Sequence, residues 1–220
     1  MSQRQYHSVL FIDARVADAG VFLTSASAGV LVVQLAPEGD GVQQIAAALA
    51  GLEGLDSIQI VSHGASGQLQ IGDTVLDAAS LAFHAAALAE WGGALRAGGD
   101  LLLYGCDVAQ GDTGAAFIDA LAGLTGADVA ASNDVTGSDL LSANWVLEAA
   151  TGSIEAASAV SVQAQQDYAH TLALVNNGSN GTLTFNTNSN VTLLNATGLA
   201  ASTVVNVTNI LPPASNPCQT

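Results

Sequence analysis

Two stretches of this chain share one form, and they restrict the possible fold more than any other feature. Residues 57–64 read SIQIVSHG and residues 100–106 read DLLLYGC, so each is an apolar run that ends in glycine beside one reactive side chain. Runs of this kind are typical of buried strands in a parallel sheet. In an open α/β sheet, chemistry takes place at the carboxyl ends of the strands. The two runs therefore predict that His63 and Cys106 lie together at one rim of a sheet.

A histidine and a cysteine at one rim provide a base and a nucleophile. A free thiol with a pKa near ~8.5 is mostly protonated at neutral pH, and a neighbouring imidazole can take that proton. Gly64 and Gly105 leave room for a substrate backbone to approach. Each residue alone also has an ordinary explanation, because a single cysteine in an apolar run is usually a small buried hydrophobe. The matched positions at two strand ends favour the catalytic interpretation of the pair.

The remainder of the chain alternates between strand-like and helix-like patterns. The strand-like runs cover residues 8–13, 29–35, 57–62, 100–104, 128–132 and 143–149, and the helix-like runs cover residues 41–52, 81–95 and 113–124. Residues 16–24 predict a short helix or a loop, and residues 67–76 alternate in polarity around a Gly-Asp pair, which predicts a small hairpin. Strands that alternate with helices indicate an α/β fold with a doubly wound, mostly parallel sheet and helices on both faces.

The composition changes after Ala173. Residues 174–220 are rich in Asn, Thr, Ser and Gly, which predicts a short β-rich or extended tail, or the start of a β module. We therefore expect an α/β domain over residues 1–173 and a separate C-terminal segment after it.

Charge excludes one class of partner. The chain has 3 Lys and Arg residues against 19 Asp and Glu residues, which gives a net charge of −16. A basic face for nucleic acid is therefore not expected. An acidic surface suits a salty or extracellular setting and attracts cationic peptides, although it also serves solubility alone.

Several other features are expected to be absent. Cys106 and Cys218 do not make a disulfide framework, and no run of about 18 apolar residues predicts a membrane span. The start of the sequence shows no pattern of a secretory signal peptide. Neither the histidines nor the carboxylates show the spacing of a metal site, so we expect no metal in the catalytic site and no cofactor.

The order of these motifs resembles that of the caspase-like cysteine peptidases, the clan of caspases, legumain, gingipains, clostripain, separase and the CHAT domains. The longer strings FIDARV, VSHGASGQLQIGDTVL, LLLYGCDVAQGDTGAAFIDALAGLTGADVAASND and NWVLEAATGSIE resemble a narrower relative. That relative is the uncharacterised domain near the N-terminus of giant bacterial surface proteins with cadherin-like or calcium-binding repeats. The resemblance covers roughly residues 8–173 and implies a caspase-like sheet.

The resemblance also implies roles for individual residues. It makes His63 the general base or acid and Cys106 the nucleophile, with the backbone amides of Gly64 and Cys106 as donors to the oxyanion. The segment 132–139, SNDVTGSD, resembles one in separases and CHAT domains where an acidic residue recognises a basic side chain. Asp134 takes that position here, or caps a turn, and the relatives have Trp where this chain has Asn133. Asp107 is a second candidate for the substrate pocket, or a cap of the strand end.

The resulting hypothesis is a cysteine endopeptidase or autoprocessing module of a secreted bacterial surface protein. Its substrate is a peptide or protein, including the chain itself, with a basic residue before the scissile bond. Arg4 is the preferred target within the chain. One alternative is a catalytically silent head domain of an adhesin, which binds a partner or retains the protein at the cell envelope. Another is a lectin or adhesin fragment in which the C-terminal segment matters. The expected location is the cell surface or the exterior, with the cytoplasm as the alternative.

Overall fold

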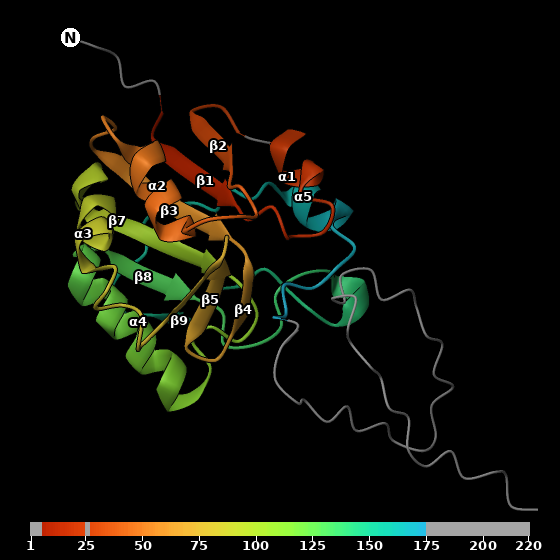
Figure 1. Cartoon of the computed structure of the whole chain (residues 1–220). Helices are drawn as coiled ribbons and strands as arrows, with labels where there is room; N and C mark the ends of the chain where they lie inside the picture. The colour runs from red at the N-terminus through yellow and green to blue at the C-terminus, as the bar shows by residue number, and fades with distance from the viewer. Residues whose placement is uncertain (1–5, 25–26, 175–220) are drawn as a thin grey trace, which may run out of the picture. The chain divides into compact units, whose positions relative to one another are not determined.

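The computed structural model describes residues 6–24 and 27–174, which fold around a six-stranded sheet (Figure 1). Its strands are β1 (Ser8–Ile12), β2 (Val30–Gln34), β3 (Leu55–Val61), β7 (Leu95–Tyr104), β8 (Asp128–Ala131) and β9 (Ala149–Ala150). The helices are α1 (Gly20–Thr24), α2 (Gly41–Leu49), α3 (Ala85–Ala94), α4 (Gly111–Thr125) and α5 (Val162–Asp167), with a 3-10 turn at Asp139–Leu141. A smaller sheet consists of β4 (His63–Ala65), β5 (Gln68–Ile71) and β6 (Thr74–Asp77).

The order of the strands in the large sheet is β2-β1-β3-β7-β8-β9. All neighbours pair in parallel except β8 and β9, which are antiparallel. The chain starts in the middle of the sheet, extends it to one edge, and then returns to extend it toward the other edge. This doubly wound, mostly parallel α/β architecture confirms the expected fold class.

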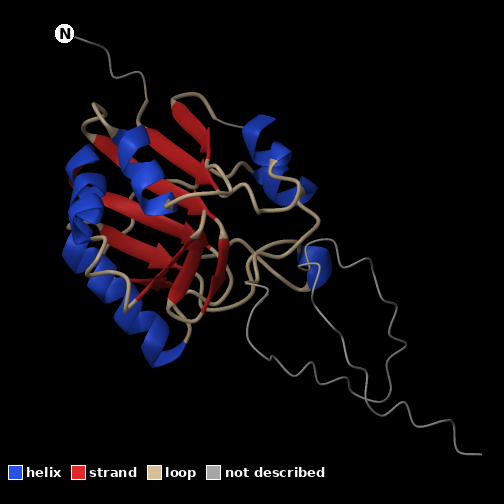
Figure 2. Cartoon of the chain, in the orientation of Figure 1, coloured by secondary structure: helices blue, strands red, loops and turns tan. Residues whose placement is uncertain are grey.

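Alternation along each buried strand builds two cores, one on each face of the sheet. In β1, Val9 and Phe11 pack with α2, α3 and α4, whereas Leu10 and Ile12 face the opposite core. Figure 2 shows α2, α3 and α4 grouped on one side of the strands, and α1 and α5 next to each other and apart from that group. The second core also contains an aromatic group, in which the Phe22, Trp145 and Tyr168 rings lie within 5.7 Å of one another. Both faces of the sheet are therefore covered.

Local signals account for one end of each of two helices. Asp40 caps α2, because its carboxylate accepts hydrogen bonds from the amides of Val42 and Gln43. Gly126 ends α4 in the left-handed conformation, with φ of 70°, which a residue without Cβ adopts readily.

Two expectations about single elements are wrong, and two short elements were not expected. Residues 143–149 were expected as a full sixth strand, but only Ala149 and Ala150 pair with β8, since the preceding segment packs its tryptophan into the second core instead. The third helix begins at Ala85 rather than at residue 81, because Asp77 and Ser80 form a hydrogen-bonded turn first. The short strand β4 and the helix α5 were not expected at all. The predicted hairpin is present as β5 and β6.

The chain divides into two units between Leu174 and Val175, and the described residues belong to the first. The predicted tail lies outside the described residues apart from Leu174, and so do Arg4 and Cys218. Among the helices of the described part, none has the length and apolar character needed to cross a bilayer.

Candidate active site

The strands that carry the two reactive residues are direct neighbours. β3 and β7 pair in parallel with Val61 opposite Tyr104, so His63 and Cys106 each follow their strand by two residues. Gly64 lies tightly against the other loop: a Cβ added to it would be 2.9 Å from the carbonyl oxygen of Cys106. The two residues are therefore at one rim of the sheet, as the sequence predicts.

The imidazole of His63 is held through one nitrogen. Its Nε2 lies 3.2 Å from the carbonyl oxygen of Arg15. Because a carbonyl oxygen can only accept, Nε2 carries a proton, and in the neutral ring the lone pair is on Nδ1. Nδ1 is buried and has no hydrogen-bond partner in the part of the chain that the structure describes. The ring is thus oriented by one nitrogen and free to accept a proton at the other.

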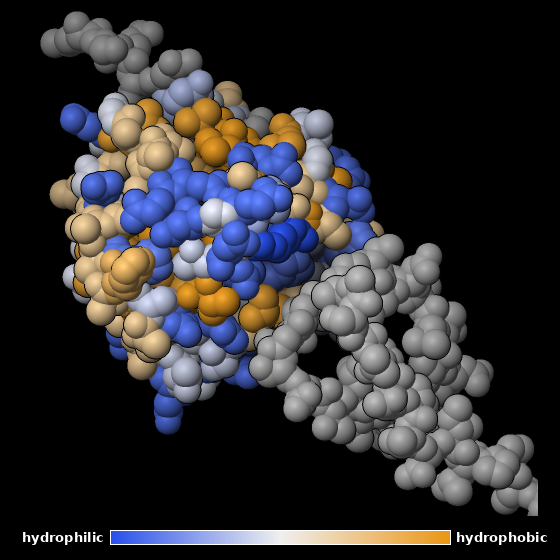
Figure 3. All heavy atoms as spheres, in the orientation of Figure 1, coloured by the Kyte–Doolittle hydropathy of each residue, from blue (hydrophilic) through white to orange (hydrophobic). Residues whose placement is uncertain are grey.

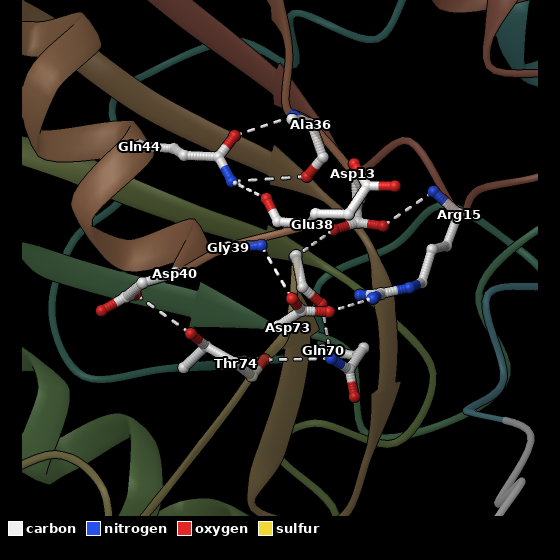
Figure 4. Close-up of polar contacts among 11 residues, drawn as sticks. Asp13, Arg15, Ala36, Glu38, Gly39, Asp40, Gln44, Gln70, Asp73 and Thr74 are labelled. Carbon is white, nitrogen blue, oxygen red and sulfur yellow. Dashed lines mark hydrogen bonds and ion pairs between the residues drawn. The ribbon is translucent and has the colours of Figure 1, made fainter.

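A polar network fixes the loop that presents the Arg15 carbonyl (Figure 4). The buried carboxylate of Asp13 accepts a hydrogen bond from the amide of Arg15 at 2.8 Å, and the Arg15 guanidinium pairs with Asp73 at 2.7 Å. The Gly39 amide donates to the same Asp73 carboxylate at 2.8 Å. The Gly39 hydrogen bond and the guanidinium hold the pKa of Asp73 below its usual value. The loop at the end of β1 is therefore tied to the β5–β6 turn.

The Arg15–Asp73 pair of this network is accessible to solvent, whereas Asp13 is buried. Figure 3 shows that hydrophilic residues gather across the middle of the face seen in Figure 1. The Arg15–Asp73 pair is more than a third exposed on both sides, so solvent weakens it, and the buried Asp13 contact is the firmer anchor.

The thiol of Cys106 is fully buried and contacts the backbone of Thr136. Its Sγ lies 3.3 Å from the amide nitrogen of Thr136 and 3.4 Å from the carbonyl oxygen of the same residue. Burial raises the pKa of the thiol, and the negative charges of Asp107 and Asp134 raise it further, while the Thr136 amide acts in the opposite direction. Within residues 6–24 and 27–174, the structure gives no hydrogen bond between the His63 ring and the sulfur. The buried environment therefore favours the neutral form of the thiol.

The two amides predicted to hold an oxyanion converge on one peptide oxygen. The amide of Gly64 donates to the carbonyl oxygen of Leu172 at 2.9 Å, and the amide of Cys106 donates to the same oxygen at 3.4 Å. Leu172 follows α5 and is fully buried in the second core. A carbonyl from a distant part of the chain thus lies where the carbonyl of a substrate is expected.

Residues on either side of Leu172 are bound in an extended form. The amide of Leu172 donates to the Thr136 carbonyl at 2.9 Å, and the carbonyl of His170 accepts from the Ser138 amide at 2.9 Å. Beyond the same peptide unit, the amide of Leu174 donates to the Gly64 carbonyl at 2.9 Å. We call residues 170–174 the rim segment.

The two acidic candidates for a substrate pocket have neutral partners. The carboxylate of Asp134 accepts from the Asn144 amide at 2.9 and 3.1 Å and from the Ser132 hydroxyl at 3.2 Å. Asp107 adopts a φ of 59°, and its carboxylate accepts from Gln110 at 2.7 Å. Burial, and then the charge of Asp134, raise the pKa of Asp107. Neither carboxylate forms an ion pair with a basic side chain of the described residues.

One group of carboxylates outside the rim lies close enough together to hold a cation, and it does not bear on the expectation of a catalytic site without metal. Oxygen atoms of Asp100, Asp128 and Glu155 lie within 4.8 Å of one another, because the register of β7 and β8 sets Asp100 beside Asp128. Such oxygens suit hard cations. The group lies at the amino-terminal end of β8, away from the rim, so it does not act on the thiol.

Three positions at the rim escaped the sequence analysis. The Arg15 carbonyl follows β1, and the position of this strand beside β3 is the signal that would have indicated it. The peptide units of Thr136 and Leu172 act through backbone atoms, which no motif of side chains reports.

Comparison with known proteins assigns a family and no more. The family model described as "Domain of unknown function (DUF4347)" matches residues 9–172, which is more than half of the chain. No curated protein and no solved structure matches the chain.

Proposed function

We propose that this chain, which belongs to the DUF4347 family of domains of unknown function, is a cysteine peptidase with His63 as base and Cys106 as nucleophile. One observation carries the proposal: the amides of Gly64 and Cys106 both donate to a single peptide oxygen, at 2.9 and 3.4 Å. Two such donors are what a tetrahedral oxyanion requires. One donor belongs to the residue after His63 and the other belongs to Cys106 itself, so both lie beside the base and the nucleophile that acyl transfer by a thiolate needs.

In the proposed reaction, Nδ1 of His63 takes the proton of the Cys106 thiol. The thiolate adds to the carbonyl carbon of the bound peptide, and the two amides stabilise the negative oxygen that forms. The C–N bond then breaks, and the imidazolium gives its proton to the leaving amine. Water hydrolyses the thioester, which releases a carboxylate and restores the thiol. The Arg15 carbonyl keeps the imidazole in the tautomer that this sequence of steps needs.

Preference for a basic residue before the scissile bond stays a prediction. The net charge of −16 supports it, since an acidic molecule attracts cationic peptides. Two observations support this preference less. The carboxylate of Asp134 already has a neutral partner, Asn144. The residue whose carbonyl oxygen accepts from both amides is Leu172, which is apolar. The proposed location at a bacterial cell surface rests on sequence resemblance.

A catalytically silent head domain is the second candidate. The observation that favours it is the state of Cys106, which is fully buried beneath the rim segment with a raised pKa. A thiol that stays in this state permanently would be a core residue, and the domain would then serve binding alone.

Covalent labelling separates the two candidates. Acyloxymethyl ketones with leucine or arginine next to the reactive group would be added to the wild type and to three variants, Cys106→Ala, His63→Ala and Leu172→Ala. The last variant is chosen to loosen the rim segment. We expect an adduct at Cys106 in Leu172→Ala, detected by peptide mass spectrometry, and slower labelling without His63. Absence of the adduct from both the wild type and Leu172→Ala would overturn the proposal, as would labelling that does not depend on His63. The faster of the two probes decides the preference.

A further inference from the structure

The rim segment is bound on both sides of one peptide bond, the bond between Leu172 and Ala173. On the amino side, Thr171 bridges Gly137 in antiparallel orientation, and Leu172 donates to Thr136. On the carboxyl side, Ala173 bridges Gly64 in parallel orientation. The chain therefore passes through the candidate site as a peptide substrate would, with contacts before and after the bond to be cut.

The contacts at the bond itself match the needs of the proposed reaction. The Leu172 oxygen takes both oxyanion donors, at 2.9 and 3.4 Å. The Thr136 carbonyl accepts from the Leu172 amide at 2.9 Å and contacts the Cys106 sulfur at 3.4 Å. One carbonyl group thus holds both the residue to be attacked and the atom that attacks it. This pre-arranged geometry is the main entropic requirement of an intramolecular step.

The two residues on either side of the Leu172–Ala173 bond differ in burial. Leu172 is fully buried in the second core, whereas Ala173 is exposed. The acyl part of the bond is thereby fixed by the domain, and the amine part faces water. A leaving group on the exposed side departs without unfolding the core.

We infer that the domain cuts its own chain between Leu172 and Ala173, an inference that rests on the proposed peptidase function. The thiolate of Cys106 adds to the Leu172 carbonyl carbon, the bond to the Ala173 nitrogen breaks, and that nitrogen takes a proton from His63. Water then converts the thioester into the Leu172 carboxylate. The products are residues 1–172 and a fragment that starts at Ala173.

The same contacts make the rim segment a block for other peptides. A second peptide needs the amides of Gly64 and Cys106, and both donate to Leu172 in the uncut chain. Cleavage in trans therefore follows cleavage in cis and departure of the segment.

The experiment is a time course of the purified full chain, followed by intact mass and N-terminal sequencing. Wild type is expected to yield a fragment that begins Ala-Leu-Val, at a first-order rate that does not change with protein concentration, and Cys106→Ala is expected to stay whole. Leu172→Ala should cut at least about tenfold more slowly, because it removes the buried side chain that fixes the acyl part of the bond in the second core. Phe83→Ala is the control for loss of a large apolar side chain: Phe83 is 83% exposed in the turn before α3, and this variant should cut at close to the wild-type rate. Leu172→Met, which keeps the volume of the side chain, retains cutting if Leu172→Ala fails only through misfolding.

Each other outcome counts against a particular claim. A new N-terminus elsewhere, or cutting that speeds up with protein concentration, overturns the inference. A wild type that stays whole but forms the ketone adduct at Cys106 refutes self-cleavage at this bond and leaves the peptidase proposal standing. A chain that neither cuts itself nor forms the adduct, in the wild type and in Leu172→Ala alike, overturns both.

Discussion

Gly64→Ala is the substitution whose effect the geometry defines most sharply. A Cβ at this position would lie 2.6 Å from Cγ2 of Val108, 2.9 Å from the carbonyl oxygen of Cys106 and 3.1 Å from the carbonyl carbon of Gly105. Ordinary contacts of such a carbon begin at about 3.4 Å. Two of the three neighbours are backbone atoms, which cannot turn away as a side chain can. The loops that carry the histidine and the cysteine must therefore move apart.

The expected cost can be set against a control in the same protein. Overpacking of this kind destabilises by about 1–3 kcal/mol, of which roughly 0.4–1 kcal/mol is offset because alanine restricts the unfolded chain. Gly93, in α3, has open space around a Cβ, so Gly93→Ala should stabilise by about 0.5–1 kcal/mol through helix propensity. The two variants should differ by about 2 kcal/mol in the free energy of unfolding. If Gly64 is a donor to the oxyanion as proposed, its displacement should also slow the proposed cleavage by about 100-fold or more.

Urea unfolding, followed by tryptophan fluorescence in the Cys106→Ala background, measures the first effect on an intact chain. The rate of appearance of the Ala173 fragment measures the second. Equal midpoints for Gly64→Ala and Gly93→Ala would refute the packing argument. A wild-type cleavage rate in Gly64→Ala would refute the role of the Gly64 amide.

Three further predictions concern stability, each measured by urea unfolding. Tyr168→Phe should stabilise by about 1 kcal/mol, because its buried hydroxyl has no partner among the described residues, whereas Tyr104→Phe should cost about as much by breaking the 2.7 Å contact with Ser158. Burial raises the pKa of Cys106 above that of the unfolded chain, so unfolding free energy should fall as pH rises above about 8.5 through the native pKa, and this fall should be smaller in Cys106→Ala. Gly92→Ala should destabilise by at least about 1–3 kcal/mol, since its Cβ would overlap a carbonyl oxygen of α4.

The part of the site that could be predicted is the part that regular strands create. The runs before His63 and Cys106 are apolar because both faces of the sheet are covered, and parallel pairing then brings the strand ends together without further information. The same reasoning gives the order of elements in the α/β domain. Strand ends were predictable because an apolar run and the reactive residue that follows it are both visible in the side chains.

The part that could not be predicted depends on backbone atoms and distant contacts. Leu172 is 66 positions after Cys106 (172 − 106), and its carbonyl reaches the rim only because α5 and Tyr168 pack beneath the sheet. No local pattern encodes such a return. The role of Asp134 was taken from a resemblance in which the register was open, and its hydrogen bonds to Asn144 depend on a loop without regular structure.

For the proposed cut between Leu172 and Ala173, the anchoring of the rim segment by β4 and by residues 136–138 sets the stoichiometry of the reaction. The part of the chain that ends at Leu172 stays attached to the catalytic domain after the cut, so its new carboxylate remains next to the thiol. Asp107 and Asp134, whose charges already act on Cys106, repel a further anion there. Release of the site for another peptide then depends on this repulsion, and salt, which screens it, should prolong occupation by the product. Until the carboxylate leaves, each molecule completes one turnover, and the amount of product counts the molecules that have folded.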